Sequence, residues 1–406
     1  MRKVRLLIVI AICLSVATPF AFSVGQPDIQ VGTLMALTGP LSEYGPAIQN
    51  GAVLAAEQLA EAGLTMGLVH EDSETNPIPA VTAAKKLIDI DGVVAIIGAL
   101  SSGVTLAVAE SATIPNEVIM ISPASTNPLM TDLPSDRNVD FLFRTCPSDA
   151  LQGVVAGNLA AENIKTASIL YVNNAYGQGL AEVFTRAFEA QGGRVLAAIP
   201  HDEAVSESYT AELRKALEGN PDALAAYSYP QHAEVYLKEA LEFFDYGSFF
   251  FCDGTKSLDI IDAVGADNLE GLIGTAPGSA GGRTLQQFND AYEAKFGELP
   301  PLPFITNAYD AMAVLGLAAY AAGAVNNVVT AADIRDRLRD VANPDGEVIY
   351  PGEFKKAFRL IDQMKPINYE GAAGSVDFDK NGDVVTPIEV WRYTNGTMET
   401  IRLETP

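Results

Sequence analysis

The chain has 406 residues, which is too long for one ordinary hydrophobic core and predicts a division into two lobes. Its 51 acidic residues outnumber 26 basic ones, and the formal net charge is −25. Because such a chain repels nucleic acid and anionic membrane surfaces, neither is expected as a partner. Its three histidines are scattered without ligand spacing, so no metal site is predicted.

Residues 1–23 have the features of a secretory signal peptide. Three basic residues (Arg2, Lys3 and Arg5) precede an apolar run at 6–17, and 21–23 form a small-x-small cleavage site. A membrane anchor is the alternative, but the apolar run is short for a span. The bulky Ile12 before Cys13 argues against a lipoprotein signal. We therefore expect an exported protein.

The stretch 28–45 predicts the first structural unit of the mature chain. Alternating apolar positions from 29 to 35 predict a buried strand, which breaks at Leu37-Thr38-Gly39-Pro40 before a helix at 47–62. Such a strand, loop and helix place ligand-binding groups at the carboxyl end of a parallel sheet. The loop offers Ser42 and Tyr44 but no glycine-rich phosphate motif, which favours capture of a small solute without a bound cofactor.

Strands and helices alternate along almost the whole chain, which predicts parallel sheets covered by helices on both faces. The expected strands are 29–35, 67–71, 93–97, 118–121, 168–172, 194–199, 223–227 and 249–252. The expected helices are 47–62, 79–90, 102–112, 151–162, 177–191, 209–218, 231–244, 258–264, 284–296, 307–322 and 331–341.

The alternation is interrupted at 141–149, at 272–282 and near 371–375, and the tail at 375–402 is typical of a hairpin. These breaks predict an α/β fold of two Rossmann-like lobes with parallel sheets, joined by three hinge crossovers. Lobe 1 would comprise 24–144 plus 277–371, and lobe 2 would comprise 145–276 plus 372–406.

Reactive and metal-binding chemistry receives little support from the sequence. Cys146 and Cys252 remain after export, and the sequence leaves open whether they form a disulfide. No nucleophile, base and acid stand in a recognisable context, so we expect no enzyme. Residues 377–382 mimic a calcium loop, but Ile388 takes the place of its last carboxylate, which favours a hairpin turn at Asn-Gly. Another Asn-Gly turn is expected at 395–396.

Seven short segments, in this order and spacing, carry a resemblance to a known family. They are LTGPLSEYG (37–45), NGAVLAAEQ (50–58), IGALSSGVT (97–105), ISPASTNP (121–128), FRTCPSDALQG (143–153), NAYGQG (174–179) and CDG (252–254). Nearly the whole mature chain resembles a type I periplasmic solute-binding protein of the leucine/isoleucine/valine-binding kind. The resemblance implies a periplasmic clamp that closes on its ligand and delivers it to a permease of the ATP-binding-cassette (ABC) class, without catalysis.

Candidate ligand contacts on lobe 1 follow two predicted strands. Ser102 opens a helix, whose N–H groups and positive dipole end favour a carboxylate, although a plain helix cap is the alternative. Ala124, Ser125 and Thr126 follow the strand at 118–121, where the Thr126 hydroxyl can donate and the Ala124 backbone can contact a ligand. The resemblance implies that these positions hold the carboxylate and ammonium of a ligand, and a simple turn is the alternative.

Candidate contacts on the other side come from an acid and three tyrosines. Asp253 ends an apolar strand, where a ligand ammonium would supply the partner that a buried carboxylate needs. The resemblance implies this role, although the family's leucine-type binders can carry Glu here, and an Asp-Gly turn is the alternative. The resemblance also places Tyr229 against the ligand. Tyr44 and Tyr176 lie on facing loops and suit an apolar side chain, with loop packing as the alternative.

The expected function is therefore capture of a hydrophobic or branched-chain amino acid by a monomeric protein that serves an ABC importer. Other ligands of the same fold, such as amides, aromatic acids or other amino acids, remain open. A ligand-sensing receptor is a second class, disfavoured because no transmembrane segment or DNA-binding motif is visible. An enzyme is a third class, and it would turn over its ligand instead of returning it unchanged.

Overall fold

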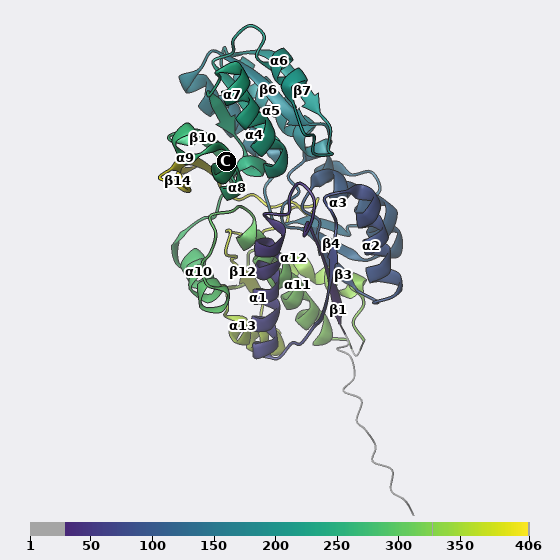
Figure 1. Ribbon diagram of the computed structural model, residues 1–406. Coiled ribbons are helices and arrows are strands. Elements are labelled where there is room, and N and C mark those ends of the chain that lie inside the picture. The colour runs from purple at the N-terminus through teal and green to yellow at the C-terminus, as the bar shows by residue number, and fades with distance from the viewer. Residues whose placement is uncertain (1–28, 327, 405–406) are drawn as a thin grey trace, which may run out of the picture.

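The computed structural model describes residues 29–326 and 328–404, so the predicted signal peptide lies outside the described residues. The chain forms two lobes, each built on a β-sheet covered by helices, as Figure 1 shows. This confirms the predicted α/β fold of two Rossmann-like lobes. Among the described residues, no helix combines the length and apolar character that a membrane crossing requires.

Lobe 1 contains a parallel sheet of five strands in the order β2-β1-β3-β4-β5. The strands are β1 (Gln30–Met35), β2 (Gly67–Asp72), β3 (Ala95–Gly98), β4 (Ile119–Ser122) and β5 (Leu142–Arg144). Every residue of β3, β4 and β5 is buried, as expected when helices cover both faces. The helices are α1 (Gly45–Ala62), α2 (Pro77–Asp89), α3 (Ser102–Val108), α10 (Gly282–Phe296), α11 (Ile305–Gly323), α12 (Ala331–Ala342) and α13 (Phe354–Asp362).

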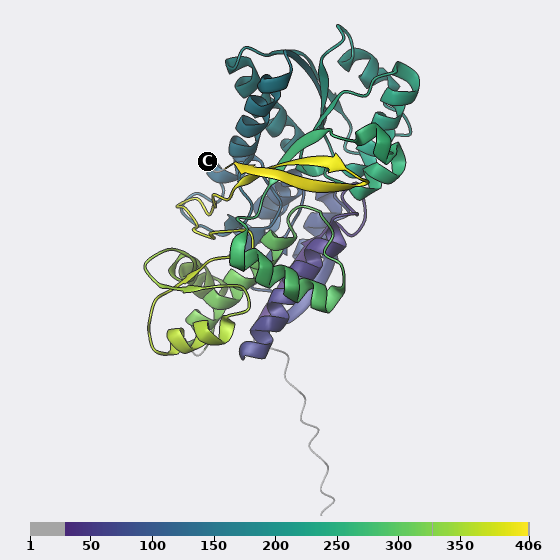
Figure 2. The ribbon, with the colours of Figure 1, turned by 90° about the vertical axis from the view of Figure 1, so that its left-hand side faces the viewer.

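Lobe 2 contains a mixed sheet of seven strands in the order β14-β13-β10-β9-β8-β6-β7. The strands are β6 (Thr166–Val172), β7 (Arg194–His201), β8 (Ala223–Tyr227), β9 (Phe249–Phe251), β10 (Ile273–Pro277), β13 (Ile388–Thr394) and β14 (Thr397–Glu404). The helices are α4 (Asp149–Asn163), α5 (Ala175–Ala190), α6 (Thr210–Ala216), α7 (Pro230–Phe244), α8 (Leu258–Val264) and α9 (Ala266–Leu269). The antiparallel hairpin β13–β14, yellow in Figure 2, lies at the level where the lobes meet.

The chain passes between the lobes three times. It crosses after β5, after β10, and between β12 (Ile367–Tyr369) and β13, where β12 pairs with β11 (Glu347–Ile349) in a small sheet. The crossings contact one another: the N–H of Gly278 donates to the Pro387 carbonyl at 2.8 Å, and the N–H of Arg144 donates to the Gly382 carbonyl at 3.0 Å. The bond from Gly278 thus joins the second and third crossings, whereas Arg144 ends β5 and ties residue 382 to lobe 1.

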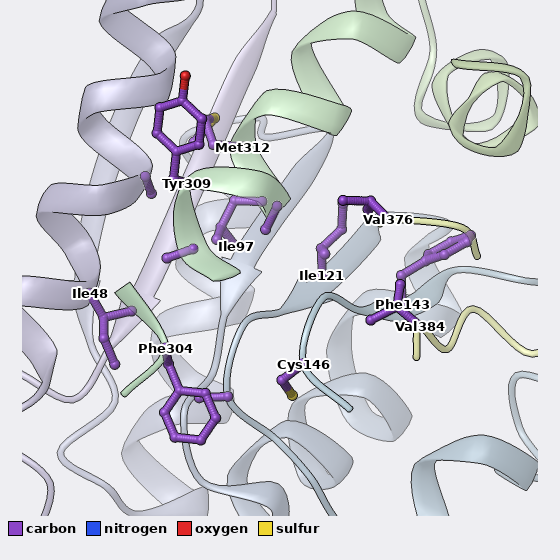
Figure 3. Packing of buried hydrophobic residues seen from close by; sticks show 14 of the residues in the cluster. Ile48, Ile97, Ile121, Phe143, Cys146, Phe304, Tyr309, Met312, Val376 and Val384 are labelled. Carbon is purple, nitrogen blue, oxygen red and sulfur yellow. The ribbon is translucent and has the colours of Figure 1, made fainter. Parts of the chain in front are cut away.

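Residues 372–383 are attached to lobe 1. Buried Asp310 of α11 accepts hydrogen bonds from the N–H groups of Ala372 and Ala373, at 2.7 and 2.8 Å. Phe378 packs edge-to-face on Phe143 at 5.2 Å between centroids, and Figure 3 shows Val384 beside Phe143. These contacts disagree with the expectation that lobe 2 resumes at residue 372. We propose that the third hinge lies at 384–387, and that the other boundaries fall near 145 and 277.

Local differences from the sequence predictions have packing causes. The glycine-rich stretch at 272–282 predicts a break, but it contains strand β10. Its Gly274 serves packing within the strand, because a side chain there would lie 2.7 Å from Trp391. The turn expected at 381–382 is present, because the N–H of Gly382 donates to the Asp379 carbonyl at 3.2 Å and the N–H of Asp379 donates to the Asp383 carbonyl at 2.8 Å. No strands flank it among the described residues, and the tail hairpin is confined to β13–β14. The turn at Asn395-Gly396 is confirmed, with φ of 51° and 73°. Helix α13 was missed.

The described residues form neither a disulfide nor a metal-binding cluster. Cys146 and Cys252 are free and buried, so they form no disulfide. The side chain of Asp379 accepts from the N–H groups of Asn381 and Asp383, which closes the calcium-loop mimic on itself. No group of three or more His, Cys, Asp or Glu side chains in residues 29–404, apart from residue 327, is arranged to hold a metal ion.

Candidate functional site

Side chains from both lobes meet around one small cavity. Its volume of about 20 Å³ is close to the space of a single water molecule. Lobe 1 contributes Leu41, Tyr44, Ile48, Leu100, Ser101, Ser102, Ala124 and Phe304, and lobe 2 contributes Tyr176, Tyr229, Asp253 and Gly254. Six of the eight predicted contact residues therefore come together at one place. A groove of about 380 Å³ lies next to it, on the other side of Phe304.

The lobe 1 wall is formed by the loops that follow β1, β3 and β4. Ser101, not Ser102, is the N-cap residue of α3, and its side chain makes no capping hydrogen bond. Its Oγ lies 2.9 Å from the Tyr229 hydroxyl, across the cleft. The Oγ of Ser102 accepts a hydrogen bond from the Asn127 N–H at 3.2 Å, so it also braces the loop after β4. Ser102 thus holds the lobe 1 side of the cavity together, whereas Ser101 links it to lobe 2.

The hydroxyls of Ser125 and Thr126 do not line the cavity. Ser125 Oγ lies 2.7 Å from the Thr105 hydroxyl and 3.1 Å from the Leu100 carbonyl. Thr126 Oγ1 donates to Asp149 Oδ2 at 2.8 Å. Ala124 does line the cavity. In this closed arrangement, the loop after β4 contributes Ala124 to the cavity, while the hydroxyls of Ser125 and Thr126 make internal hydrogen bonds.

Asp253 is the chemically distinctive residue of the lobe 2 wall. It begins a short 3-10 turn directly after β9, and only 3% of its surface is exposed. Its Oδ1 accepts hydrogen bonds from Gln152 Nε2 at 2.7 Å and from the Tyr176 hydroxyl at 2.9 Å. Burial raises the pKa of the Asp253 carboxyl to about 6. A carboxylate held in this way favours a cationic partner.

Two stacked tyrosines and a glycine complete the lobe 2 wall. The rings of Tyr176 and Tyr229 lie 5.5 Å apart and nearly parallel, at 13°. The Asn174 side chain donates to the Tyr229 hydroxyl at 3.0 Å. Gly254 is required, because a Cβ there would lie 2.2 Å from the Ser228 carbonyl. The wall is therefore rigid and combines aromatic faces with one carboxylate.

The loop Leu41–Gly45, named here the latch loop, joins the lobes across the cleft. Glu43 Oε1 accepts from the N–H of Leu258 at 2.7 Å, at the start of α8. The Tyr44 hydroxyl donates to the carbonyls of Asp253 and Lys256, at 3.0 and 3.2 Å. Burial raises the pKa of Glu43 to about 7. The latch loop therefore contacts both the turn that carries Asp253 and the start of α8 across the cleft.

Several cavity residues were not predicted from the sequence. Leu41, Ile48, Leu100, Ser101, Gly254 and Phe304 line the cavity, and Gln152 lies behind it. Ser101 and Gly254 are direct neighbours of predicted residues. Phe304 precedes α11 with a left-handed φ of 71°, after a proline-rich run and not after a strand. Figure 3 shows its ring near Ile48, which lies on α1.

The fold and the cavity define a two-lobed binding protein. Residues 28–397 match the family model for the periplasmic binding protein, and the chain belongs to this family. Its resemblance to the leucine/isoleucine/valine-binding group is confirmed by relatives and by solved structures.

Of three similar proteins described next, the second and third are named for leucine binding. A chemotactic signal transduction system substrate-binding protein, BasB of Halobacterium salinarum, is 29% identical over 93% of this chain and 90% of its own length. The leucine-, isoleucine-, valine-, threonine- and alanine-binding protein of Pseudomonas aeruginosa is 27% identical over 90% of this chain and 89% of its own. The leucine-binding protein LivK of Thermotoga maritima superposes with a TM-score of 0.77 at 25% identity, covering 93% of this chain and 99% of LivK.

Proposed function

We propose that this chain captures an amino acid with an apolar side chain between its lobes, outside the cytoplasm, and delivers it as a monomer to an ABC permease without chemical change. One observation carries the proposal: a buried carboxylate, a serine-lined helix start and a cluster of apolar side chains from both lobes meet in one cavity. The names of the Pseudomonas aeruginosa and Thermotoga maritima relatives support the same class of ligand.

Each part of an amino acid has a complementary wall. Asp253 would accept the ammonium group, because its carboxylate is buried and Tyr176 adds an aromatic face. Ser101, Ser102 and the backbone at Ala124 would receive the carboxylate on the lobe 1 side. Leu41, Ile48, Leu100 and Phe304 would surround the side chain. Ser125 and Thr126 would contribute hydroxyls only after exchanging their present hydrogen bonds.

Ligand entry requires the lobes to separate. The present cavity of about 20 Å³ cannot hold an amino acid, and the hydrogen bond between Ser101 and Tyr229 spans the place where a ligand would lie. An amino acid would replace such cross-lobe bonds with its own contacts to both walls. Binding therefore favours the closed lobes only if the ligand's contacts to both walls are stronger than the cross-lobe bonds that they replace.

Calorimetric titration of the mature protein, stripped of carried-over ligand, tests the proposal. We expect saturable binding of leucine, isoleucine or valine, with recovery of the ligand unchanged. A panel of aromatic acids and amides provides the alternative ligands of the fold. Binding only of solutes that lack an α-ammonium group would contradict the role of Asp253, and conversion of a ligand would contradict the binding-protein class.

A second candidate function is presentation of the captured ligand to a chemotaxis receptor. The observation that favours it is the 29% identity with BasB over 93% of this chain. The two functions share the ligand site and differ in the membrane partner. Pull-down of the ligand-bound protein with detergent-solubilised host membranes, followed by identification of captured proteins, would separate a permease from a receptor.

Replacing Glu43 with alanine should weaken amino-acid binding by roughly 2- to 30-fold. Glu43 accepts from the first N–H groups of α8 across the cleft, so its loss destabilises the closed form and not the open one. The affinity of the tightest-binding amino acid, measured by calorimetry, provides the readout. Glu61→Ala is the matched control, because Glu61 is exposed at the far end of α1. Equal affinities of the two variants would show that the latch loop does not stabilise closure.

A further inference from the structure

A second buried carboxyl group lies behind the cavity. Asp149 is the first residue of α4 and is fully buried. Its Oδ2 accepts the hydrogen bond from Thr126 Oγ1 at 2.8 Å. Its Oδ1 is buried and has no hydrogen-bond partner among the described residues. A carboxylate oxygen buried without a donor is costly, so this atom needs an explanation.

Gln152, one turn further along α4, leaves a second acceptor unpaired. Its Nε2 donates to Asp253 Oδ1 at 2.7 Å and to the Thr275 carbonyl at 3.2 Å. Its Oε1 is buried and also lacks a partner in the described part of the chain. Residues three apart share one face of a helix, so the side chains that carry these two unpaired acceptors are neighbours. A proton on Asp149 Oδ1 would convert one of them to a donor and satisfy both.

The hydrogen bonds favour ionisation of Asp253 over ionisation of Asp149. Asp253 receives two side-chain donors, from Gln152 and Tyr176, whereas Asp149 receives one, from Thr126. Donors stabilise the charged form, so Asp253 is the better anion. Burial, followed by the charge of Asp253, raises the pKa of Asp149 well above its ordinary value.

Of the residues that the structure describes, the one cation that acts on Asp149 neutralises a second charge only in part: Arg144 lowers the pKa of Asp149, but by less than burial and the charge of Asp253 raise it. Arg144 lies on the preceding crossing, but its guanidinium already binds both carboxylate oxygens of Asp383, each at 2.8 Å. The thiols and phenols on which the charges of Asp149 or Asp253 act have pKa values that burial raises, so they stay neutral and supply no cation. They are Cys146, Cys252, Tyr44, Tyr176, Tyr227 and Tyr229.

We propose that Asp149 is a neutral, protonated positioning residue whose Oδ1–H donates to Gln152 Oε1. This bond fixes the orientation of the Gln152 amide, so that Nε2 faces Asp253 and holds its carboxylate toward the cleft. Asp149 thereby acts on the ligand through Gln152, without touching it. The proposal rests on the ligand role of Asp253 under the proposed function.

Asp149→Asn separates this role from that of an ionised or merely structural residue. The asparagine amide can place its NH₂ where the acid has its O–H while its oxygen accepts from Thr126, so it reproduces the protonated form. We expect this variant to bind the tightest-binding amino acid within about twofold of the wild type. Asp149→Ala and Gln152→Leu, which break the chain of bonds, should each lose about tenfold in affinity.

Infrared difference spectroscopy gives a readout that needs no ligand. At about pH 8, above the usual carboxyl range, the wild type should show the carbonyl stretch of a protonated carboxylic acid that Asp149→Asn lacks. Asp89→Asn, an exposed position on α2, is the matched control and should leave this band unchanged. Circular dichroism and a melting curve would verify that each variant is folded.

Two results would overturn the proposal: no loss of the band in Asp149→Asn, or a loss of tenfold or more in affinity for this variant. Failure of every amino acid to bind would instead contradict the proposed function. In that case the infrared band still decides whether Asp149 holds a proton, because the measurement is made on the free protein.

Discussion

Replacing Asp253 with asparagine is expected to weaken binding of the cognate amino acid by roughly 100-fold, because the ligand ammonium would lose a buried charged partner. The substitution keeps the shape of the side chain and its acceptor for Gln152 and Tyr176. Titration calorimetry gives the affinity, and Asp259→Asn, exposed on nearby α8, is the control. Loss of stability with unchanged affinity would show that Asp253 only ties the turn after β9 to α4 and α5.

The pH dependence of binding provides a second test of the same residue. Burial raises the pKa of Asp253 from 3.8 to about 6. The ionised form attracts an ammonium and the protonated form does not, so affinity should be lost as the pH falls through about 6. One unit below that value the Kd should rise about tenfold. A flat profile between about pH 7 and pH 5 would contradict the pairing of Asp253 with a cation.

Replacing Arg144 with methionine should lower the free energy of unfolding by about 3 kcal/mol, because it breaks a buried ion pair with Asp383. This value is at the lower end of the usual cost of breaking such a pair, since Asp383 is partly exposed. The guanidinium also donates to the Asn127 carbonyl at 3.0 Å and to Thr131 Oγ1 at 2.8 Å. Methionine fills similar space but leaves these acceptors unpaired. Urea unfolding, followed by circular dichroism, measures the change.

The control for this prediction is Arg137→Met, which removes an exposed ion pair to Asp132. Its effect should stay below about 0.5 kcal/mol, since exposed pairs contribute little. A loss of less than about 1 kcal/mol for Arg144→Met would indicate that Asp383 is rehydrated when its partner is removed. The attachment of residues 372–383 to lobe 1 would then depend on Asp310 and Phe378 instead.

Residues that follow a parallel strand could be predicted from the sequence. Ser102, Ala124, Tyr229 and Asp253 come just after β3, β4, β8 and β9, and parallel strands bring their carboxyl ends to one edge. Phe304 could not be found this way, because it enters the cavity from the loop before α11. The partners of Ser125 and Thr126 were equally inaccessible, since they depend on how α3 and α4 pack against the loop after β4.

Domain boundaries show a similar limit. A glycine-rich stretch was a sound signal of a break, but at Gly274 the small residue makes room for Trp391 within a strand. We propose a third crossing at 384–387 instead of 372. Residues 372–383 carry turn chemistry, and the contacts that attach them to lobe 1 come from Asp310, Phe143 and Arg144, which are distant in sequence.

A hydrogen bond between two crossings restricts how the lobes can move. The second and third crossings are bound side by side through Gly278 and Pro387, and sliding one past the other would break this bond. The bonds from Ala280 to Ala373 and from Arg144 to Gly382 fix the neighbouring residues on the lobe 1 side. Bending about an axis that passes near the bond from Gly278 to Pro387 would leave it intact. We therefore expect the lobes to open mainly by bending at these two crossings, so that the same facing walls meet at each closure.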